Sequence, residues 1–324
     1  MQGVIDLRPM DLGDVLDGTI RVYRAAPWVL IGIYAVIAAI PLFIQQTSGQ
    51  YFWDVLMEAF NQAPTAGPDA MNAFRSSDFY TAIVAYGAGS ILMFFLAPIA
   101  QAAMVYAVSE TILGRSVSVA ESIRSIMPRA GSIILAYVLL GLVVMATYSP
   151  IILFVALAAR GPENLAVAMY FLPFFPVSAL FLLYISVKLL FIPHAVILDD
   201  LGAVDAFRRS WRLVAGYWLR TFGIYLLIML IVSVIATLLN QSARLVVMGL
   251  NAIPGMTQLI VNASSGVVIT VISLIVQPLT IIATTLLYYD LRIRKEGFDL
   301  LVLASAVAGD DSKGADASEQ LPFG

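Results

Sequence analysis

Long apolar runs alternate along this chain with shorter segments that carry nearly all of its charge. Six of these runs lie at about residues 28–46, 80–110, 130–158, 166–198, 217–240 and 263–290. Each is long enough for the roughly 18–20 residues that cross a bilayer. A segment inside lipid must be helical, because only a helix pairs all of its own backbone groups. The pattern predicts an all-α polytopic membrane bundle with six transmembrane helices.

An amphipathic segment precedes the first, third and fifth spans, so that the chain resembles three repeats of a surface helix followed by a membrane hairpin. The segments before spans 1 and 5 match at a constant offset: Asp14 with Asp205, Arg21 with Arg212, Gly32 with Gly223 and Tyr34 with Tyr225. The segment before span 3, "SVAESIRSIMPRAG", has the same character in a looser register. Repeated halves are common in membrane folds, which supports three such units.

The segment before span 5 gives the clearest amphipathic pattern. Its apolar positions recur every three or four residues, which predicts one helical stripe: Val204, Phe207, Trp211, Val214 and Trp218. Three arginines fall on the other side: Arg208, Arg209 and Arg212. An apolar face opposite arginines is typical of a helix that lies at the headgroup level. We favour ordinary topology determinants as their interpretation, and specific contact with anionic lipid or a partner protein is the alternative.

Composition agrees with a membrane protein and excludes several kinds of site. Of 324 residues, 60% are hydrophobic and 12% are charged, whereas soluble domains are about 25% charged. The chain has no cysteine and a single histidine, His194, so disulfides, thiolate nucleophiles and two-histidine metal sites are excluded. Acidic residues in the first 27 positions argue against a cleaved signal peptide.

The basic residues are distributed very unevenly between alternate loops. Three lie on one side, at Arg75, Arg160 and Arg244. Lys188 lies inside span 4, and fourteen lie on the other side: Arg8, Arg21, Arg24, Arg115, Arg124, Arg129, Arg208, Arg209, Arg212, Arg220, Arg292, Arg294, Lys295 and Lys313. Since Lys and Arg are enriched in cytoplasmic loops, both termini are predicted to be cytoplasmic, in the plasma membrane of a prokaryote.

These boundaries divide the chain into three parts. Residues 1–27 form a cytoplasmic amphipathic segment, residues 28–290 form the membrane domain, and residues 291–324 form a cytoplasmic tail that is disordered from about residue 304. The segment 47–79 is predicted to be the largest external loop, with Phe52, Trp53 and Phe60 at the outer headgroup level.

Polar residues inside the spans are the best pointers to a site, because burying charge in lipid is costly. Lys188 either reaches toward the headgroups or pairs with Glu110 or Asp290 at the ends of neighbouring spans. Asp290 has a nearer candidate in Arg294, one helical turn on. Gln101 and Gln277 lie near mid-membrane beside prolines, where they either hydrogen-bond between helices or line a substrate path.

Residues that could perform catalysis are nearly absent. A general base would need His194 to act with Asp199 or Asp200 in "FIPHAVILDD", and a lone polar residue at a helix end is the favoured alternative. No phosphate-binding loop, metalloprotease motif or nucleophile elbow is present. The sequence therefore predicts a protein that is not an enzyme and has no cofactor.

Three motifs carry a resemblance to a known family: "LRPMDLGDVLDGTIRVYR", "AVILDDLGAVDAFRRSWRLVAGYW" and "LLYYDLRIRKEGFDL". Over about residues 5–302 the chain resembles the membrane-domain family named after glycerophosphoryl diester phosphodiesterase. The resemblance implies six spans in a prokaryotic plasma membrane. It implies no phosphodiesterase activity, because the catalytic barrel of that family's enzymes, with its histidines and metal-binding carboxylates, has no counterpart here.

Three functional hypotheses follow. The first is a membrane organiser or accessory module, not an enzyme, whose partners are the lipid bilayer, anionic headgroups or another membrane protein, and not nucleic acid. The second is a small-molecule or lipid transporter with a path lined by Gln101 and Gln277. The third is a lipid-headgroup enzyme built on His194, Asp199 and Asp200.

Overall fold

The computed structural model describes residues 8–62, 76–158, 164–251 and 257–297, and these are all helical or form short connections. Its helices are α1 (Leu12–Ala25), α2 (Pro27–Gln62), α4 (Ser77–Ile112), α5 (Val119–Ile126), the 3-10 turn η2 (Met127–Arg129), α6 (Ala130–Ala158), α7 (Leu165–Met169), α8 (Phe174–Lys188), α9 (Ile192–Leu198), α10 (Ala203–Val214), α11 (Trp218–Asn251) and α12 (Gln258–Glu296). Six helical segments of these residues are long and apolar enough to cross a membrane. The predicted all-α six-span fold is confirmed.

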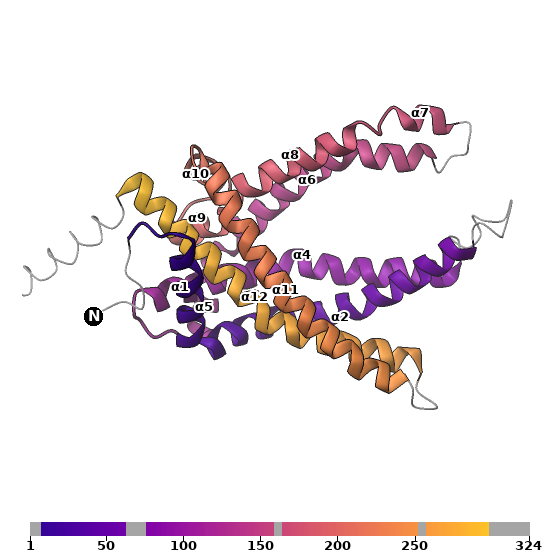
Figure 1. The fold of residues 1–324 in the computed structure, drawn as a ribbon, viewed down its shortest axis with the longest axis horizontal. Coiled ribbons are helices and arrows are strands. Elements are labelled where there is room, and N and C mark those ends of the chain that lie inside the picture. The colour runs from indigo at the N-terminus through magenta and orange to yellow at the C-terminus, as the bar shows by residue number, and fades with distance from the viewer. Residues whose placement is uncertain (1–7, 63–75, 159–163, 252–256, 298–324) are drawn as a thin grey trace, which may run out of the picture.

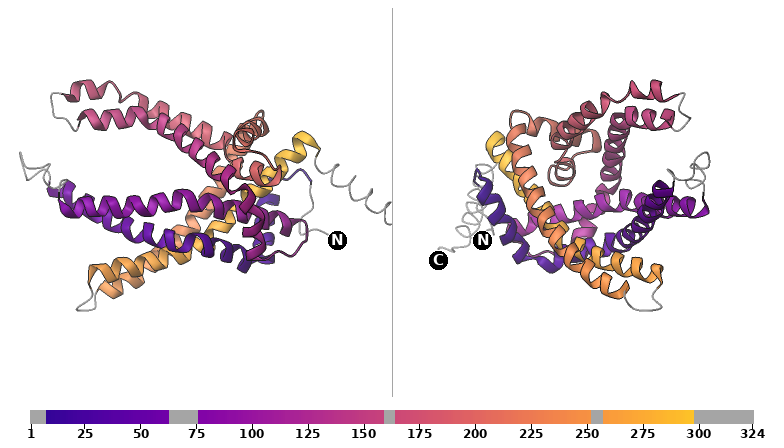
Figure 2. Two further views of the ribbon diagram at one scale, coloured as in Figure 1. Left: turned by 180° about the vertical axis from the view of Figure 1, so that it is seen from behind. Right: turned by 45° about the vertical axis from the view of Figure 1, so that its right-hand side comes forward.

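The membrane helices form three antiparallel pairs, α2 with α4, α6 with α8, and α11 with α12 (Figure 1). The pairs converge at the end of the molecule that holds α1, α5, α9 and α10, and they diverge toward the other end (Figure 2). The buried core therefore lies near the convergent end, where residues 281–291 of α12 are all buried.

Each pair is preceded by a short amphipathic helix, as the repeat predicts. These helices are α1, α5 and α10, and each has an acidic residue at its third position: Asp14, Glu121 and Asp205. Acids in the first turn favour the helix dipole, and in α1 and α5 the acid also closes a capping box. The alignment of Asp14 with Asp205 thus corresponds to the same position in two helices.

Helix α2 continues to Gln62, past residue 46, where the first span is predicted to end. Of the polar side chains near that position, one bonds to a neighbouring helix and one bonds within α2. Gln45 donates to Ser90 Oγ at 3.4 Å, and Ser48 donates to the carbonyl of Ile44 at 2.6 Å. Phe52, expected at the headgroups, stacks on Tyr86 of α4 with ring centroids 5.3 Å apart.

The predicted fourth span, 166–198, is three helices rather than one. Helix α8 begins after Pro173, and the backbone breaks again between Lys188 and Ile192. Proline cannot donate the hydrogen bond that a continuous helix needs. At the second break Ser210 of α10 supplies the missing partners: its hydroxyl donates to the carbonyl of Lys188 at 2.7 Å and accepts from the N–H of Phe191 at 3.2 Å.

Helix α12 runs to Glu296, past residue 290, where the sixth span is predicted to end. It ends at Gly297, which has a left-handed backbone conformation with φ of 61°, the usual glycine stop of a helix. Residues 298–324, including Asp299 and the predicted disordered tail, lie outside the described residues.

A close approach of α2 and α4 depends on a glycine and gives a first prediction. A Cβ atom on Gly89 would lie 2.9 Å from the Cα atom of Gln45, whereas one on Gly87 would meet nothing within 4 Å. Gly89→Ala is therefore expected to push the helices apart and lower the free energy of unfolding by about 1–3 kcal/mol. Gly87→Ala should raise it slightly, because alanine favours helix. Thermal unfolding of both variants in one detergent measures the contrast, and equal shifts would contradict it.

Candidate functional site

The convergent end of the molecule contains a buried carboxylate with several partners. Asp290 of α12 is 0% exposed. Its side chain accepts from the N–H of Met10 at 2.8 Å, from Arg294 at 2.8 Å and from Arg220 at 3.1 Å. The carbonyl of Met10 in turn accepts from Arg220 at 2.6 Å and from Arg294 at 2.8 Å. We call Met10, Arg220, Asp290 and Arg294 the Asp290 cluster. It fastens the N-terminal segment to the ends of α11 and α12.

Lys188 does not join this cluster. Its side chain is buried, and its Nζ atom lies 5.0 Å from the ring centroid of Trp211 and 5.7 Å from that of Tyr184. Such a position is a cation–π contact. Glu110, the other partner considered, pairs with Arg115 at 3.3 Å. Among the described residues, Lys188 therefore contacts aromatic rings of α8 and α10 rather than a carboxylate.

A second cluster surrounds Asp199, at the end of α9. This carboxylate accepts from Arg209 at 2.6 Å and from the hydroxyl of Tyr288 at 2.7 Å, and it pairs with Arg292 at 3.2 Å. Arg209 also binds both oxygens of Glu296. These hydrogen bonds, to Glu296 first and to Asp199, raise the pKa of Arg209. The Asp199 cluster thus ties α9, α10 and α12 together.

The structure does not assemble the three residues of the enzyme hypothesis. Asp200 is exposed and pairs with Arg129 at 2.5 Å, and this hydrogen bond lowers the pKa of its carboxyl. His194 is 1% exposed, and its Nε2 atom lies 3.1 Å from Thr285 Oγ1. The imidazole stacks on Tyr288 with ring centroids 5.3 Å apart. His194 and Asp199 therefore contact the same tyrosine, while Asp200 faces elsewhere.

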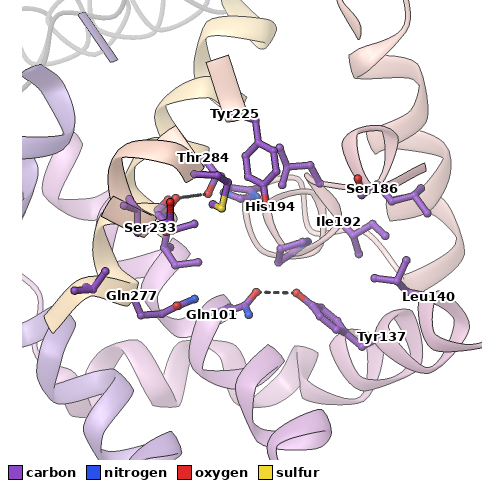
Figure 3. Close-up of a pocket in the computed structure, with 18 of the residues that line it drawn as sticks. Gln101, Tyr137, Leu140, Ser186, Ile192, His194, Tyr225, Ser233, Gln277 and Thr284 are labelled. Carbon is purple, nitrogen blue, oxygen red and sulfur yellow. Dashed lines mark hydrogen bonds between the residues drawn. The ribbon is translucent and has the colours of Figure 1, made fainter. Parts of the chain in front are cut away.

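A cavity of about 770 Å³ lies among α4, α6, α8, α9, α11 and α12. Gln101 and Gln277 both line it, and the hydroxyl of Tyr137 donates to Gln101 Oε1 at 2.9 Å (Figure 3). Its other polar lining residues are Tyr148, Ser186, His194, Tyr225, Ser233, Asn240, Ser273, Thr280 and Thr284. Aliphatic side chains such as Leu140, Met229 and Ile272 form most of the remaining wall. Among the described lining residues there is no aspartate, glutamate, lysine or arginine.

The amphipathic helix α10 packs on the bundle mainly through small residues and leaves part of its predicted apolar stripe exposed. Its buried residues are Ala203, Ala206, Ser210, Leu213 and Val214, whereas Val204 and Trp211 are 52% and 42% exposed. Small side chains at Ala206 and Ser210 let α10 approach the α8–α9 break closely, which bulky Phe207 and Trp211 would prevent. Trp218 is not on this helix, since the chain turns at Gly216 and α11 begins at Trp218.

The three arginines of α10 also separate into two kinds. Arg209 belongs to the Asp199 cluster. Arg208 is 72% exposed and touches only Asp205, at 3.3 Å, among the described residues. The Arg212 side chain forms no hydrogen bond or ion pair with any described residue, and it lies with Arg208 and Trp211 along an apolar groove. Only Arg208 and Arg212 are therefore available to an outside ligand.

Several residues of these clusters gave no signal in the sequence. Met10 contributes only its backbone, and Arg220 appeared to be one more topology determinant. Tyr288 lies near the end of the sixth predicted span, a position that suits an interfacial aromatic residue, yet it is buried and bound to Asp199. Sequence spacing predicts the pairs within α12, Asp290 with Arg294 and Arg292 with Glu296, because each pair lies four residues apart on one helix.

Comparisons with known proteins identify a family but no activity. A family model described as a domain of unknown function, DUF7847, matches residues 10–291. No curated protein and no solved structure matches the chain. The matched range begins at Met10 and ends beside Asp290, so it includes the first five membrane helices and most of α12. The resemblance to the phosphodiesterase membrane-domain family stays a prediction.

Proposed function

We propose a function from the geometry of the cavity, because the chain belongs to the DUF7847 family, whose description assigns none. In this proposal the multi-pass membrane protein is a carrier that binds an uncharged, lipid-like molecule between its helices. The observation that carries the proposal is the cavity at Gln101 and Gln277. Its volume of about 770 Å³ falls within the roughly 300–1,000 Å³ of ligand pockets.

The lining chemistry supports this class of ligand. Mostly aliphatic walls suit a hydrocarbon chain or ring, and the scattered amides and hydroxyls suit a few uncharged polar groups. A charged ligand would need an opposite charge nearby, since an unpaired charge within a membrane is costly. The described lining residues offer none.

A pair of tryptophan variants on α11 tests the proposal. Val232 lines the cavity, whereas Val234, two residues on, is 50% exposed and lies outside the lining. Val232→Trp should fill the cavity and remove most of the bound molecule, and Val234→Trp should leave it in place. Mass spectrometry of molecules that remain with the purified proteins measures the difference, and proteoliposome assays with the molecule so identified measure its movement.

Two results would contradict the carrier proposal. One is the same set of retained molecules in Val232→Trp and Val234→Trp. The other is a wild-type protein that holds only the average lipids of its membrane. Replacing Gln101 and Gln277 together with leucine adds a second arm, which should weaken binding of a polar ligand group without closing the cavity.

The organiser hypothesis is a second candidate, supported by the gathering of α1, α5 and α10 at one end of the molecule. In this proposal that end faces the cytoplasm of a prokaryote, as the distribution of lysine and arginine predicts. Much of each amphipathic helix, however, is buried against the bundle. This burial supports a structural role for α1 and α5 and leaves α10 as the helix with an open apolar surface.

A further inference from the structure

A groove beside α10 combines an apolar floor with two arginines. It is lined by Val143 of α6, by Ile185 and Leu189 at the end of α8, and by Phe207 and Trp211 of α10. Arg208 and Arg212 border the groove, together with Asp205. Hydrocarbon contacts and guanidinium groups therefore occur within one site, at the convergent end of the helices (Figure 1).

The position of Trp211 is fixed by its neighbours. Its ring meets that of Tyr184 edge to face at a centroid distance of 5.9 Å. The ammonium group of Lys188 lies on the same ring at 5.0 Å. Since these contacts come from α8, the tryptophan is held in place before any ligand arrives, which reduces the entropic cost of binding.

The charge around the groove favours an anion. Arg208 and Arg212 line it, and Lys188 lies under its tryptophan. Lys295 is close by, because its Nζ atom donates to the carbonyl of Arg212 at 2.7 Å. Asp205 is the one acid in the lining, and it pairs with Arg208. The lining itself therefore holds two arginines and one carboxylate, and Lys188 and Lys295 add positive charge beside it.

We infer that this groove binds one anionic phospholipid. The phosphate would contact Arg208 and Arg212, and an acyl chain would lie along Val143, Ile185 and Leu189. Arginine forms paired hydrogen bonds with phosphate oxygens. An anionic leaflet also attracts basic residues on an amphipathic helix at its surface. Arg209 takes no part, because Asp199 and Glu296 already bind it. The groove shares Ile185 and Leu189 with the wall of the cavity but holds its own arginines, and its occupant does not depend on the carrier proposal.

Lipid binding to the full chain in nanodiscs tests the inference. The discs contain phosphatidylcholine with an increasing fraction of brominated phosphatidylglycerol. Bromine quenches tryptophan fluorescence, so the loss of fluorescence with rising phosphatidylglycerol measures occupancy of the site beside Trp211. The Arg208→Gln/Arg212→Gln variant should bind phosphatidylglycerol about 30-fold more weakly, given the usual contribution of each basic residue near an anionic surface. An unchanged affinity would overturn the inference.

Two further variants separate a built site from general attraction to the leaflet. Arg24→Gln/Arg124→Gln removes the same charge from exposed positions on α1 and α5 and should leave the affinity near that of the wild type. Val143→Phe adds neither charge nor a tryptophan but narrows the groove, and it should weaken binding. An equal loss in the two arginine pairs, or full binding by Val143→Phe, would show attraction to the membrane surface without a specific lipid site.

Discussion

Replacing Asp290 with alanine is expected to lower the free energy of unfolding by about 3–5 kcal/mol, because it removes one partner from a buried ion cluster. The carboxylate is 0% exposed and receives hydrogen bonds from Arg220, Arg294 and the N–H of Met10. Without it, two guanidinium groups keep only the carbonyl of Met10 as a shared acceptor in the cluster.

The measurement is unfolding in mixed detergent micelles, followed by circular dichroism. Asp205→Ala is the matched control, because Asp205 also pairs with an arginine but is 62% exposed in its side chain. Exposed pairs contribute at most about 1 kcal/mol. Asp290→Asn should fall between the two, since its amide oxygen can still accept from Met10. Equal effects of Asp290→Ala and Asp205→Ala would contradict a structural role for the cluster.

The second large effect is expected at Asp199, with its neighbour Asp200 as an internal control. Asp199→Asn should lower the free energy of unfolding by about 2–3 kcal/mol, because its charge binds Arg209, Arg292 and Tyr288. Asp200→Asn should change it far less. Asp200 is 73% exposed in its side chain and has one arginine partner, and asparagine tolerates its left-handed backbone, which has φ of 54°.

Both variants replace aspartate with asparagine, and their positions are adjacent in the sequence. Unfolding in the same micelles therefore compares the two environments directly. If Asp200→Asn were the more damaging change, the Asp199 cluster would not be what joins α9 to α10 and α12.

Hydrophobic pattern alone was enough to predict the six spans and the three amphipathic helices, because both depend on local periodicity. It is less informative at the end of span 1, where Gln45 and Ser48 resemble loop residues. In the structure these side chains face other helices or bond within α2, so polarity there reports packing between helices rather than exposure to water.

The candidate sites were less predictable, since their contacts join distant parts of the chain. Asp290 and Arg294 lie four residues apart on one helix, and spacing predicts their pairing. Arg220 is 70 residues from Asp290 and Met10 is 280 residues away, and no periodicity relates them. Lys188 shows the same limit, because its partner Trp211 lies on a helix that folds back across the α8–α9 break.

The Asp290 cluster also has a consequence for biosynthesis. The ribosome makes Met10 near the start of the chain and Asp290 in the last transmembrane helix, so the N-terminal segment has no carboxylate to bind until nearly the whole protein has been made. Domains and helices made earlier can pack as they emerge, but this contact closes only when α12 is inserted. A chain that stops short of residue 290 therefore lacks the carboxylate that pairs with Arg220, and only the carbonyl of Met10 is left in the cluster to accept from this arginine.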